Sequence, residues 1–181
     1  AAEMSLRIAP GLSGNRLRDY AFTKLKTFDR AMWDAEVALA RNAQKPTPSA
    51  PLPIYGSDKY GYAITDAREN IAANNLADCV HLKQVNILEV SAPAPTGVLV
   101  TNPPYGERLG EVDDLASLYP KLGDVLKQKF AGWRAYFFTG DPQLAKLVRL
   151  SASKRTPLFN GKLECRLFEY KIIAGSNRKP A

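Results

Sequence analysis

The sequence contains very few of the residues that build metal centres and covalent nucleophiles. Its 181 residues include one histidine, His81, and two cysteines, Cys79 and Cys165, with no metal-ligand spacing around them. Two such cysteines are typical of half-buried thiols in a reducing compartment, so we expect a cytoplasmic protein without a metal site. No apolar run is long enough to indicate a signal peptide or a membrane span.

Acidic residues are also in the minority. The chain has 25 basic and 18 acidic side chains, a net charge of +7 and an isoelectric point near 9.4. This balance favours a polyanionic partner, because basic side chains that bind phosphates release counterions. A basic solvated surface would give the same composition, so charge alone indicates a class of partner and no activity. The basic residues gather between residues 16 and 30, at 154–155 and at 178–179.

Strand and helix patterns alternate along the chain. Short apolar runs predict strands, and apolar residues at helical spacing predict helices. The predicted strands are 54–58, 80–85, 97–101, 133–139, 155–159 and 163–173. The predicted helices are the tail of one at 1–8, then 29–44, 59–76, one marked by Leu115 to Leu126, and 142–150.

Alternation of this kind predicts an α/β fold, a doubly wound and mostly parallel sheet formed by one domain over residues 1–181. Residues 175–181 read as a polar tail. Asn160-Gly161 favours a tight turn, so the last two strands should form an antiparallel hairpin. Pro120 should lie in the first turn of its helix or kink it. The spacing of Trp33, Tyr119 and Trp133 predicts packing residues.

The tetrapeptide Asn102-Pro103-Pro104-Tyr105 is the strongest chemical signal, and it follows the aliphatic run 98–100. The run predicts a buried parallel strand, which the prolines stop because they cannot donate ladder hydrogen bonds. The carboxyl ends of such strands are where α/β sheets bind ligands. There the Asn102 side-chain oxygen and the Pro103 carbonyl oxygen could each accept a hydrogen bond from one N–H group of an exocyclic amine, while Tyr105 stacks on the base. The other reading is a plain proline turn.

Two further strand ends carry polar residues. Ser57 and Asp58 close one predicted strand, and an acidic residue in that position can accept hydrogen bonds from both ribose hydroxyls of a nucleoside. Asp58 could equally cap the following helix. Asn86 follows the next strand, where its amide could pair with an adenine ring, or could simply shape a turn.

Together, Gly56-Ser57-Asp58 and Asn102-Pro103-Pro104-Tyr105-Gly106-Glu107-Arg108-Leu109 resemble the guanine-N2 RNA methyltransferases of the bacterial large-subunit ribosomal RNA type. The resemblance extends over nearly the whole chain. Asn-Pro-Pro-Tyr alone is shared with adenine-N6 enzymes, and the Gly-Glu-Arg-Leu extension favours RNA guanine. The resemblance implies a class I, Rossmann-like methyltransferase fold with S-adenosylmethionine as methyl donor. It also implies a THUMP domain upstream.

In this reading Asn102, Pro103, Pro104 and Tyr105 are catalytic, and Ser57, Asp58, Asn86 and Asn102 bind the donor. Arg16, Arg18, Lys24, Lys26 and Arg108 are the expected contacts to ribosomal RNA. The chain departs from the family in lacking the glycine-rich donor-binding loop and, with it, the first strand of the sheet. It also has Asn86 where the family has aspartate. Two alternatives stay open: an adenine-N6 nucleic-acid methyltransferase, and a non-catalytic RNA-binding fragment.

Overall fold

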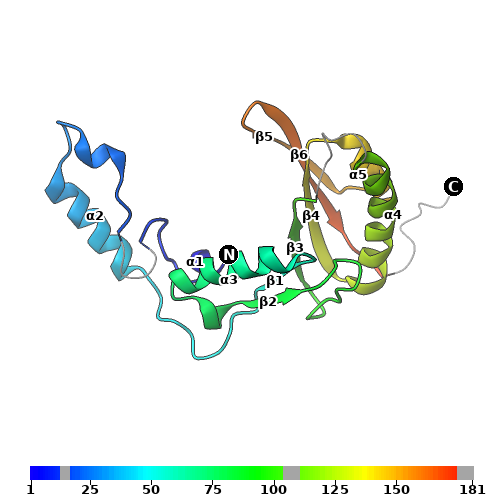
Figure 1. Ribbon diagram of the computed structural model, residues 1–181, viewed down its shortest axis with the longest axis horizontal. Helices are drawn as coiled ribbons and strands as arrows, with labels where there is room; N and C mark the ends of the chain where they lie inside the picture. The colour runs from blue at the N-terminus through cyan, green and yellow to red at the C-terminus, as the bar shows by residue number, and fades with distance from the viewer. Residues whose placement is uncertain (13–16, 104–110, 175–181) are drawn as a thin grey trace. The chain divides into compact units, whose positions relative to one another are not determined.

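The structure is a computed structural model that describes residues 1–12, 17–103 and 111–174, apart from the side chains of residues 111–115 and 144. It divides into two compact units, residues 1–86 and 87–181, each with its own sheet and its own core. Both units contain a parallel pair of strands, and helices alternate with strands along the chain (Figure 1). This arrangement confirms the predicted α/β class.

The first unit is built on two short parallel strands. β1 (Tyr55–Asp58) pairs with β2 (His81–Gln84), and the register sets Asp58 beside Gln84 at their carboxyl ends. Its core is small, consisting of Ala2, Leu6, Leu76 and Cys79 with partly buried aliphatic neighbours. The helices of this unit are α1 (Ala2–Ser5), η1 (Ala21–Lys24), α2 (Arg30–Asn42), α3 (Gly61–Ala73) and η2 (Ala77–Cys79).

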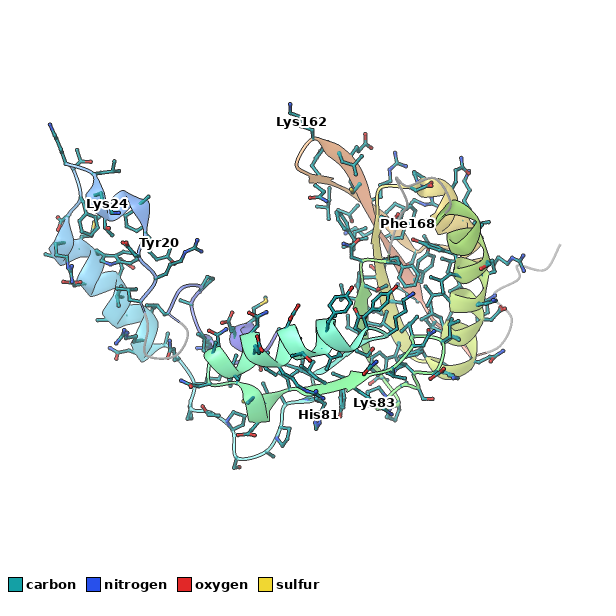
Figure 2. The ribbon with its side chains drawn as sticks, viewed as in Figure 1. Tyr20, Lys24, His81, Lys83, Lys162 and Phe168 are labelled. Carbon is teal, nitrogen blue, oxygen red and sulfur yellow. The ribbon has the colours of Figure 1, made fainter. Side chains whose placement is uncertain are left out.

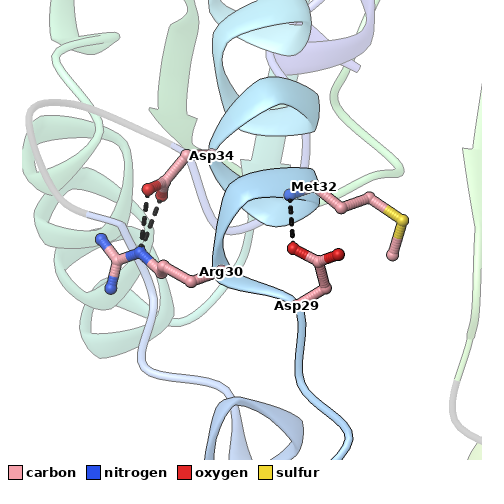
Figure 3. A network of polar contacts seen from close by, with 4 residues as sticks. All are labelled: Asp29, Arg30, Met32 and Asp34. Carbon is pink, nitrogen blue, oxygen red and sulfur yellow. Dashed lines mark hydrogen bonds and ion pairs between the residues drawn. The ribbon is translucent and has the colours of Figure 1, made fainter.

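Helix α2 begins with a side-chain cap from Asp29, but none of its residues is buried. Asp29 Oδ1 accepts a hydrogen bond from the backbone N–H of Met32 at 2.9 Å, which satisfies one of the unpaired donors of the first turn. Arg30 Nε donates to both carboxylate oxygens of Asp34, at 3.0 and 2.9 Å (Figure 3). The helix is therefore held by local polar contacts and by its aromatic side chain, Trp33, rather than by a buried face.

The second unit contains one four-stranded sheet in the order β3-β4-β6-β5. β3 is parallel to β4, whereas β6 is antiparallel to both of its neighbours. Two helices, α4 and α5, lie against one face of this sheet (Figure 1). The bounds are β3 (Gly97–Thr101), α4 (Glu111–Lys129), β4 (Trp133–Thr139), α5 (Pro142–Leu147), β5 (Lys154–Asn160) and β6 (Leu163–Lys171).

The core of the second unit lies between the sheet and these helices. Aromatic rings dominate it: Phe137 packs edge-to-face on Tyr170 with ring centres 5.5 Å apart, and Phe130 packs in the same way on Trp133 at 5.5 Å. The predicted packing roles of Tyr119 and Trp133 are confirmed, because both side chains are buried in this core. Burial of this much aromatic surface is the main stabilising contribution within the unit.

The strand that precedes the tetrapeptide is not the fully buried one that its aliphatic run predicts. β3 is an edge strand, and although Leu99 packs against the core, Val98 and Val100 are 59% and 71% exposed. Side chains alternate between the two faces of a strand, and within this unit helices cover only one of those faces. Sequence hydrophobicity cannot tell a strand covered on both faces from one covered on a single face.

Several expected bounds also shift. Pro120 lies in the middle of α4, not in its first turn, and the helix runs on for nine residues after it. The predicted helix 59–76 is shorter, and α5 and β6 end at Leu147 and Lys171. Both cysteines are fully buried free thiols rather than half-buried ones.

The hairpin between β5 and β6 is antiparallel as predicted, but its turn lies one residue later. Asn160 pairs with Leu163, which leaves Gly161 and Lys162 as the two loop residues. Gly161 has φ +61°. A positive φ at the first loop position alone is the pattern of a type II′ turn, which favours glycine there. The Asn160-Gly161 dipeptide therefore predicted the hairpin correctly, but the two central residues of the turn are Gly161 and Lys162.

Candidate functional site

The carboxyl end of β3 presents Asn102 to solvent. The strand ends at Thr101, where the register pairs it with Phe137 of β4, and the next residue, Asn102, is exposed. Pro103 is buried and has no N–H, so it ends the ladder and anchors the backbone directly behind the amide. The sequence prediction of an abrupt strand end with a projecting asparagine is confirmed for these two residues.

The neighbouring strand supports this end of the sheet with a closely bonded turn. Thr139, the last residue of β4, is buried, and its hydroxyl accepts from the N–H of Asp141 at 3.1 Å. Asp141 Oδ1 in turn accepts from the N–H of Gln143 at 2.7 Å, at the start of α5. These bonds satisfy backbone donors that would otherwise be unpaired where the strand gives way to the helix. Sequence reasoning did not predict this supporting turn.

A buried tyrosine ties β6 to α5 beneath the same edge. The Tyr170 hydroxyl donates to the Ala145 carbonyl at 3.2 Å, and its ring packs against Phe137. Burial raises the pKa of Tyr170 to about 12, with a smaller opposing effect of the Arg155 charge. The phenol therefore stays neutral at any physiological pH, and its role is to hold the sheet and helix together.

The carboxyl ends of β1 and β2 bring together the predicted donor-binding residues of the first unit. Ser57 and Asp58 end β1 and are exposed, and Asn86, half-buried, follows the end of β2. Asp58 is not the cap of α3, which begins at Gly61 after Tyr60 and has no side-chain cap. Its Oδ1 instead accepts a hydrogen bond from the N–H of Tyr60 at 2.8 Å. This is the turn that an aspartate side chain commonly forms with the backbone N–H two residues later. Among the described residues, none donates to Asp58 Oδ2.

Two residues beside Asp58 were missed by sequence reasoning. Gln84 Nε2 donates to the Lys59 carbonyl at 3.2 Å and so ties the turn after β1 to the end of β2. Tyr60 is a largely exposed ring, with the Lys59 ammonium 4.7 Å from its centre and the Tyr62 ring stacked at 5.4 Å. An exposed aromatic ring beside a carboxylate is a platform on which a planar base can stack. The signal was the tyrosine two positions after Asp58.

Three of the expected RNA contacts lie in the exposed segment that leads into α2. Arg18, Lys24 and Lys26 are all exposed, and the Arg18 guanidinium lies 5.6 Å from the centre of the Tyr20 ring (Figure 2 labels Tyr20 and Lys24). Tyr20 and Phe22 stack on each other and meet Trp33 edge-on, at ring-centre distances of 5.7 and 5.1 Å. Trp33 thus packs in this small surface cluster, not in a buried core.

The remaining predicted site residues, Pro104, Tyr105, Arg16 and Arg108, lie outside the described residues. Asn102 and Pro103 belong to the second unit, whereas Ser57, Asp58 and Asn86 belong to the first. Within the described ranges there is no cluster of three or more potential metal ligands. Nor does that part of the chain contain a helix both long and apolar enough to cross a membrane.

Comparison with known proteins identifies the family. Residues 1–169 match the model of the RMKL-like methyltransferase domain, which is more than half of the chain. The chain belongs to this family. A similar curated protein is the ribosomal RNA large subunit methyltransferase K/L of Shewanella sp. (strain W3-18-1), 37% identical over 180 residues. That alignment covers 99% of this chain and 25% of the relative, so the chain spans about a quarter of that protein's length.

Solved structures show the fold of this methyltransferase domain. SMU.472, a putative methyltransferase complexed with SAH (S-adenosylhomocysteine), matches with a TM-score of 0.80 at 29% identity, over 98% of this chain and 45% of that one. A predicted N6-adenine-specific DNA methylase from Listeria monocytogenes str. 4b F2365 matches with a TM-score of 0.77 at 25% identity, over 93% and 42%. The expected class I methyltransferase, Rossmann-like architecture is therefore confirmed.

Proposed function

We propose that this chain is the catalytic part of an S-adenosylmethionine-dependent methyltransferase that modifies the exocyclic N2 amine of a guanine in large-subunit ribosomal RNA. The observation that carries the proposal is the exposed amide of Asn102, fixed by the buried Pro103 at the carboxyl end of β3, in a chain of this family. The sequence after it, with Tyr105 and the Gly106-Glu107-Arg108-Leu109 extension, favours guanine in RNA as the substrate.

Methyl transfer to an exocyclic amine depends mainly on hydrogen-bond acceptors beside the nitrogen. An exocyclic purine amine is a poor nucleophile because its lone pair is delocalised into the ring. The Asn102 side-chain oxygen and the Pro103 carbonyl oxygen can each accept a hydrogen bond from one of the two N–H groups of the amine. These hydrogen bonds favour a tetrahedral nitrogen, whose lone pair is free to attack the methyl group. Acceptors held in place before the reaction contribute through positioning and electrostatics. A guanine in structured RNA must first leave its stack to reach them, and Tyr105 would then hold the flipped ring.

The first unit offers groups that fit the donor. The exposed carboxylate of Asp58 uses Oδ1 for its own turn, which leaves Oδ2 for a ribose hydroxyl. Ser57 and Asn86 lie at the same strand ends, and the exposed Tyr60 ring could stack on adenine. S-adenosylmethionine supplies an electrophilic methyl group when bound. The proposal includes Arg16, Arg18, Lys24, Lys26 and Arg108 as RNA contacts and a THUMP domain in the longer protein.

An adenine-N6 methyltransferase is the second candidate. Asn-Pro-Pro-Tyr fits either exocyclic amine, and the name of the similar Listeria monocytogenes protein describes an N6-adenine-specific DNA methylase. Hydrogen bonds from the exocyclic amine to Asn102 and Pro103 would be the same for both purines, so identifying the modified nucleoside distinguishes the two candidate functions. A non-catalytic RNA-binding fragment is the third reading, and it predicts RNA affinity with no response to S-adenosylmethionine.

The variant Asn102→Ala tests the proposed role in the full-length protein. We expect kcat to fall by about 10²–10³, the size typical for removal of one pre-organised polar group. The dissociation constant for S-adenosylhomocysteine should stay within about twofold, because Ser57, Asp58 and Asn86, the other three proposed donor contacts, are unchanged. Asn70→Ala, which removes an exposed amide from α3, is the matched control and should keep full activity. Unchanged turnover in Asn102→Ala would refute the assignment.

A further inference from the structure

The β5–β6 hairpin extends past the edge of the sheet where Asn102 lies. The register sets Thr101, Phe137, Phe168 and Arg155 in one row across the four strands. Beyond that row β4 continues only to Thr139, whereas β5 continues for five residues to Asn160, about 17 Å at the usual rise per residue. Figure 2 shows the result, with Lys162 at the tip of the hairpin and Phe168 back in the sheet.

One face of this overhang combines an exposed aromatic ring with arginines. Side chains alternate along a strand, so Arg155, Pro157 and Phe159 share a face, and the register adds Arg166 and Glu164 to it. Phe159 is 70% exposed, and Arg155 and Arg166 are exposed as well. The Arg166 guanidinium lies 3.4 Å from a carboxylate oxygen of Glu164, both side chains being largely open to solvent. Such a pair is weak and easily exchanged for a phosphate.

The hairpin is also basic as a whole. Residues 154–171 contain five basic side chains, Lys154, Arg155, Lys162, Arg166 and Lys171, against two acidic ones, Glu164 and Glu169. Charged residues and a proline on an edge strand commonly serve to prevent aggregation, and Pro157 and the lysines fit that role. An exposed phenylalanine four residues beyond Arg155 works against it, because it adds an apolar group to a free edge. The exposed ring is available to a partner, and the charges beside it favour a polyanion.

We propose that this hairpin binds the RNA segment next to the target guanine, with Phe159 stacked on an unpaired base and Arg155, Lys162 and Arg166 in contact with phosphates. The inference rests on the proposed function for its target. β5 is separated from β3 by three strand spacings, about 14 Å, a distance that a few nucleotides span. Sequence-tolerant stacking on aromatic rings and arginine planes is the usual way that proteins hold unpaired RNA. A base beside a flipped nucleotide has lost a stacking neighbour, and Phe159 can replace it.

The test is RNA affinity of the full-length protein and its Phe159→Ala variant, measured by fluorescence anisotropy with unmodified large-subunit ribosomal RNA fragments. We expect affinity to fall about tenfold in Phe159→Ala, within the range for loss of one stacked base, and to return in Phe159→Trp. Leu158→Ala, on the opposite face and 41% exposed, is the matched control and should bind within twofold of wild type. Arg155→Gln and Arg166→Gln should each reduce the salt slope by about 0.7.

Equal RNA affinity of Phe159→Ala and wild type would overturn the proposal, as would a wild-type protein that binds no RNA. A change of oligomeric state in Phe159→Ala with RNA affinity unchanged would overturn it too, and would assign the ring to self-association. Methyl transfer measured in the same samples separates this result from the proposed function. If wild type binds RNA and Phe159→Ala binds it more weakly, the hairpin role stands even where no methyl group is transferred. If transfer to guanine occurs and the affinities are equal, only the hairpin role fails.

Discussion

The two units of this chain support their functional groups in different ways. In residues 87–181 a core of large aromatic and aliphatic side chains underlies the sheet, and Asn102 directly follows the end of β3, whose last residue pairs with Phe137 of that core. In residues 1–86 the buried cluster is small, the sheet has two strands, and Asp58 is fixed by one local turn. The proposed role of Asn102, polarising a reacting amine, would benefit from rigid packing, whereas the ribose contact proposed for Asp58 needs only local order.

The same substitution in each unit sharpens this comparison. A Cβ on Gly123 of α4 would overlap the backbone carbonyl oxygen of Val148, whereas a Cβ on Gly56 of β1 would lie 2.7 Å from the end of the flexible Leu82 side chain. Gly123→Ala should therefore lower the free energy of unfolding by about 2–3 kcal/mol, even after the gain in helix propensity. Gly56→Ala should cost less than about 1 kcal/mol.

Urea denaturation of both variants measures these values. The packed core of the second unit is the reason for the difference, because a backbone carbonyl cannot move aside as a side-chain methyl can. Equal losses in the two variants, or a larger loss in Gly56→Ala, would contradict this account of where the molecule is rigid.

The pH dependence of stability tests the packing of the second unit's core through a single buried side chain. The pKa of Tyr170 is raised to about 12 in the folded protein, above the value near 10 of an exposed tyrosine. Its stabilising contribution is complete below pH 10 and is lost as the pH rises toward 12, because the unfolded chain ionises first. In that window Tyr170 should contribute a loss of up to about 1.4 kcal/mol per pH unit.

Tyr170→Phe should remove that part of the slope. It should also lower stability by about 1 kcal/mol at pH 7, through loss of the bond to the Ala145 carbonyl. Thermal unfolding from pH 8 to 11 of the variant and wild type provides the measurement. Parallel curves above pH 10 would show that the buried phenol does not respond to pH as described.

The last prediction concerns the proposed donor-binding residues of the first unit. Asp58→Asn keeps an oxygen for the Tyr60 N–H but removes the charge, so the turn should remain while the ribose contact weakens. We expect affinity for S-adenosylhomocysteine to fall about tenfold, or roughly 1.4 kcal/mol, by isothermal titration calorimetry. Glu69→Gln, an exposed acid on α3, is the control for loss of charge alone. Identical affinities of Asp58→Asn and wild type would exclude Asp58 from the donor site.

Sequence reasoning succeeded where one local signal decided the structure. The bounds of β3 and β4 follow from their apolar runs and from Asn102-Pro103, since proline cannot extend a ladder. The exposure of the side chains could not be predicted in the same way. Val98 and Val100 have the hydrophobicity of buried residues, and only the arrangement of strands and helices shows that they are uncovered.

The polar contacts of the site were harder still to predict. The Tyr60 N–H bond to Asp58, the Gln84 bond to Lys59 and the Thr139 turn depend on backbone geometry that no spacing rule encodes. The overhang of Phe159 likewise depends on register, because it requires the row from Thr101 to Arg155 to be known. Sequence indicated the candidate site residues, and the structure was needed to show which contacts hold them.

The most direct test of the central claim is methyl transfer from labelled S-adenosylmethionine to unmodified large-subunit ribosomal RNA, with the full-length protein and nucleoside analysis of the product. The account predicts N2-methylguanosine, formed by wild type and largely absent with Asn102→Ala. N6-methyladenosine as the product would contradict the assignment to guanine. No transfer at all, from a protein that binds both RNA and donor, would contradict the catalytic role of Asn102 and Pro103.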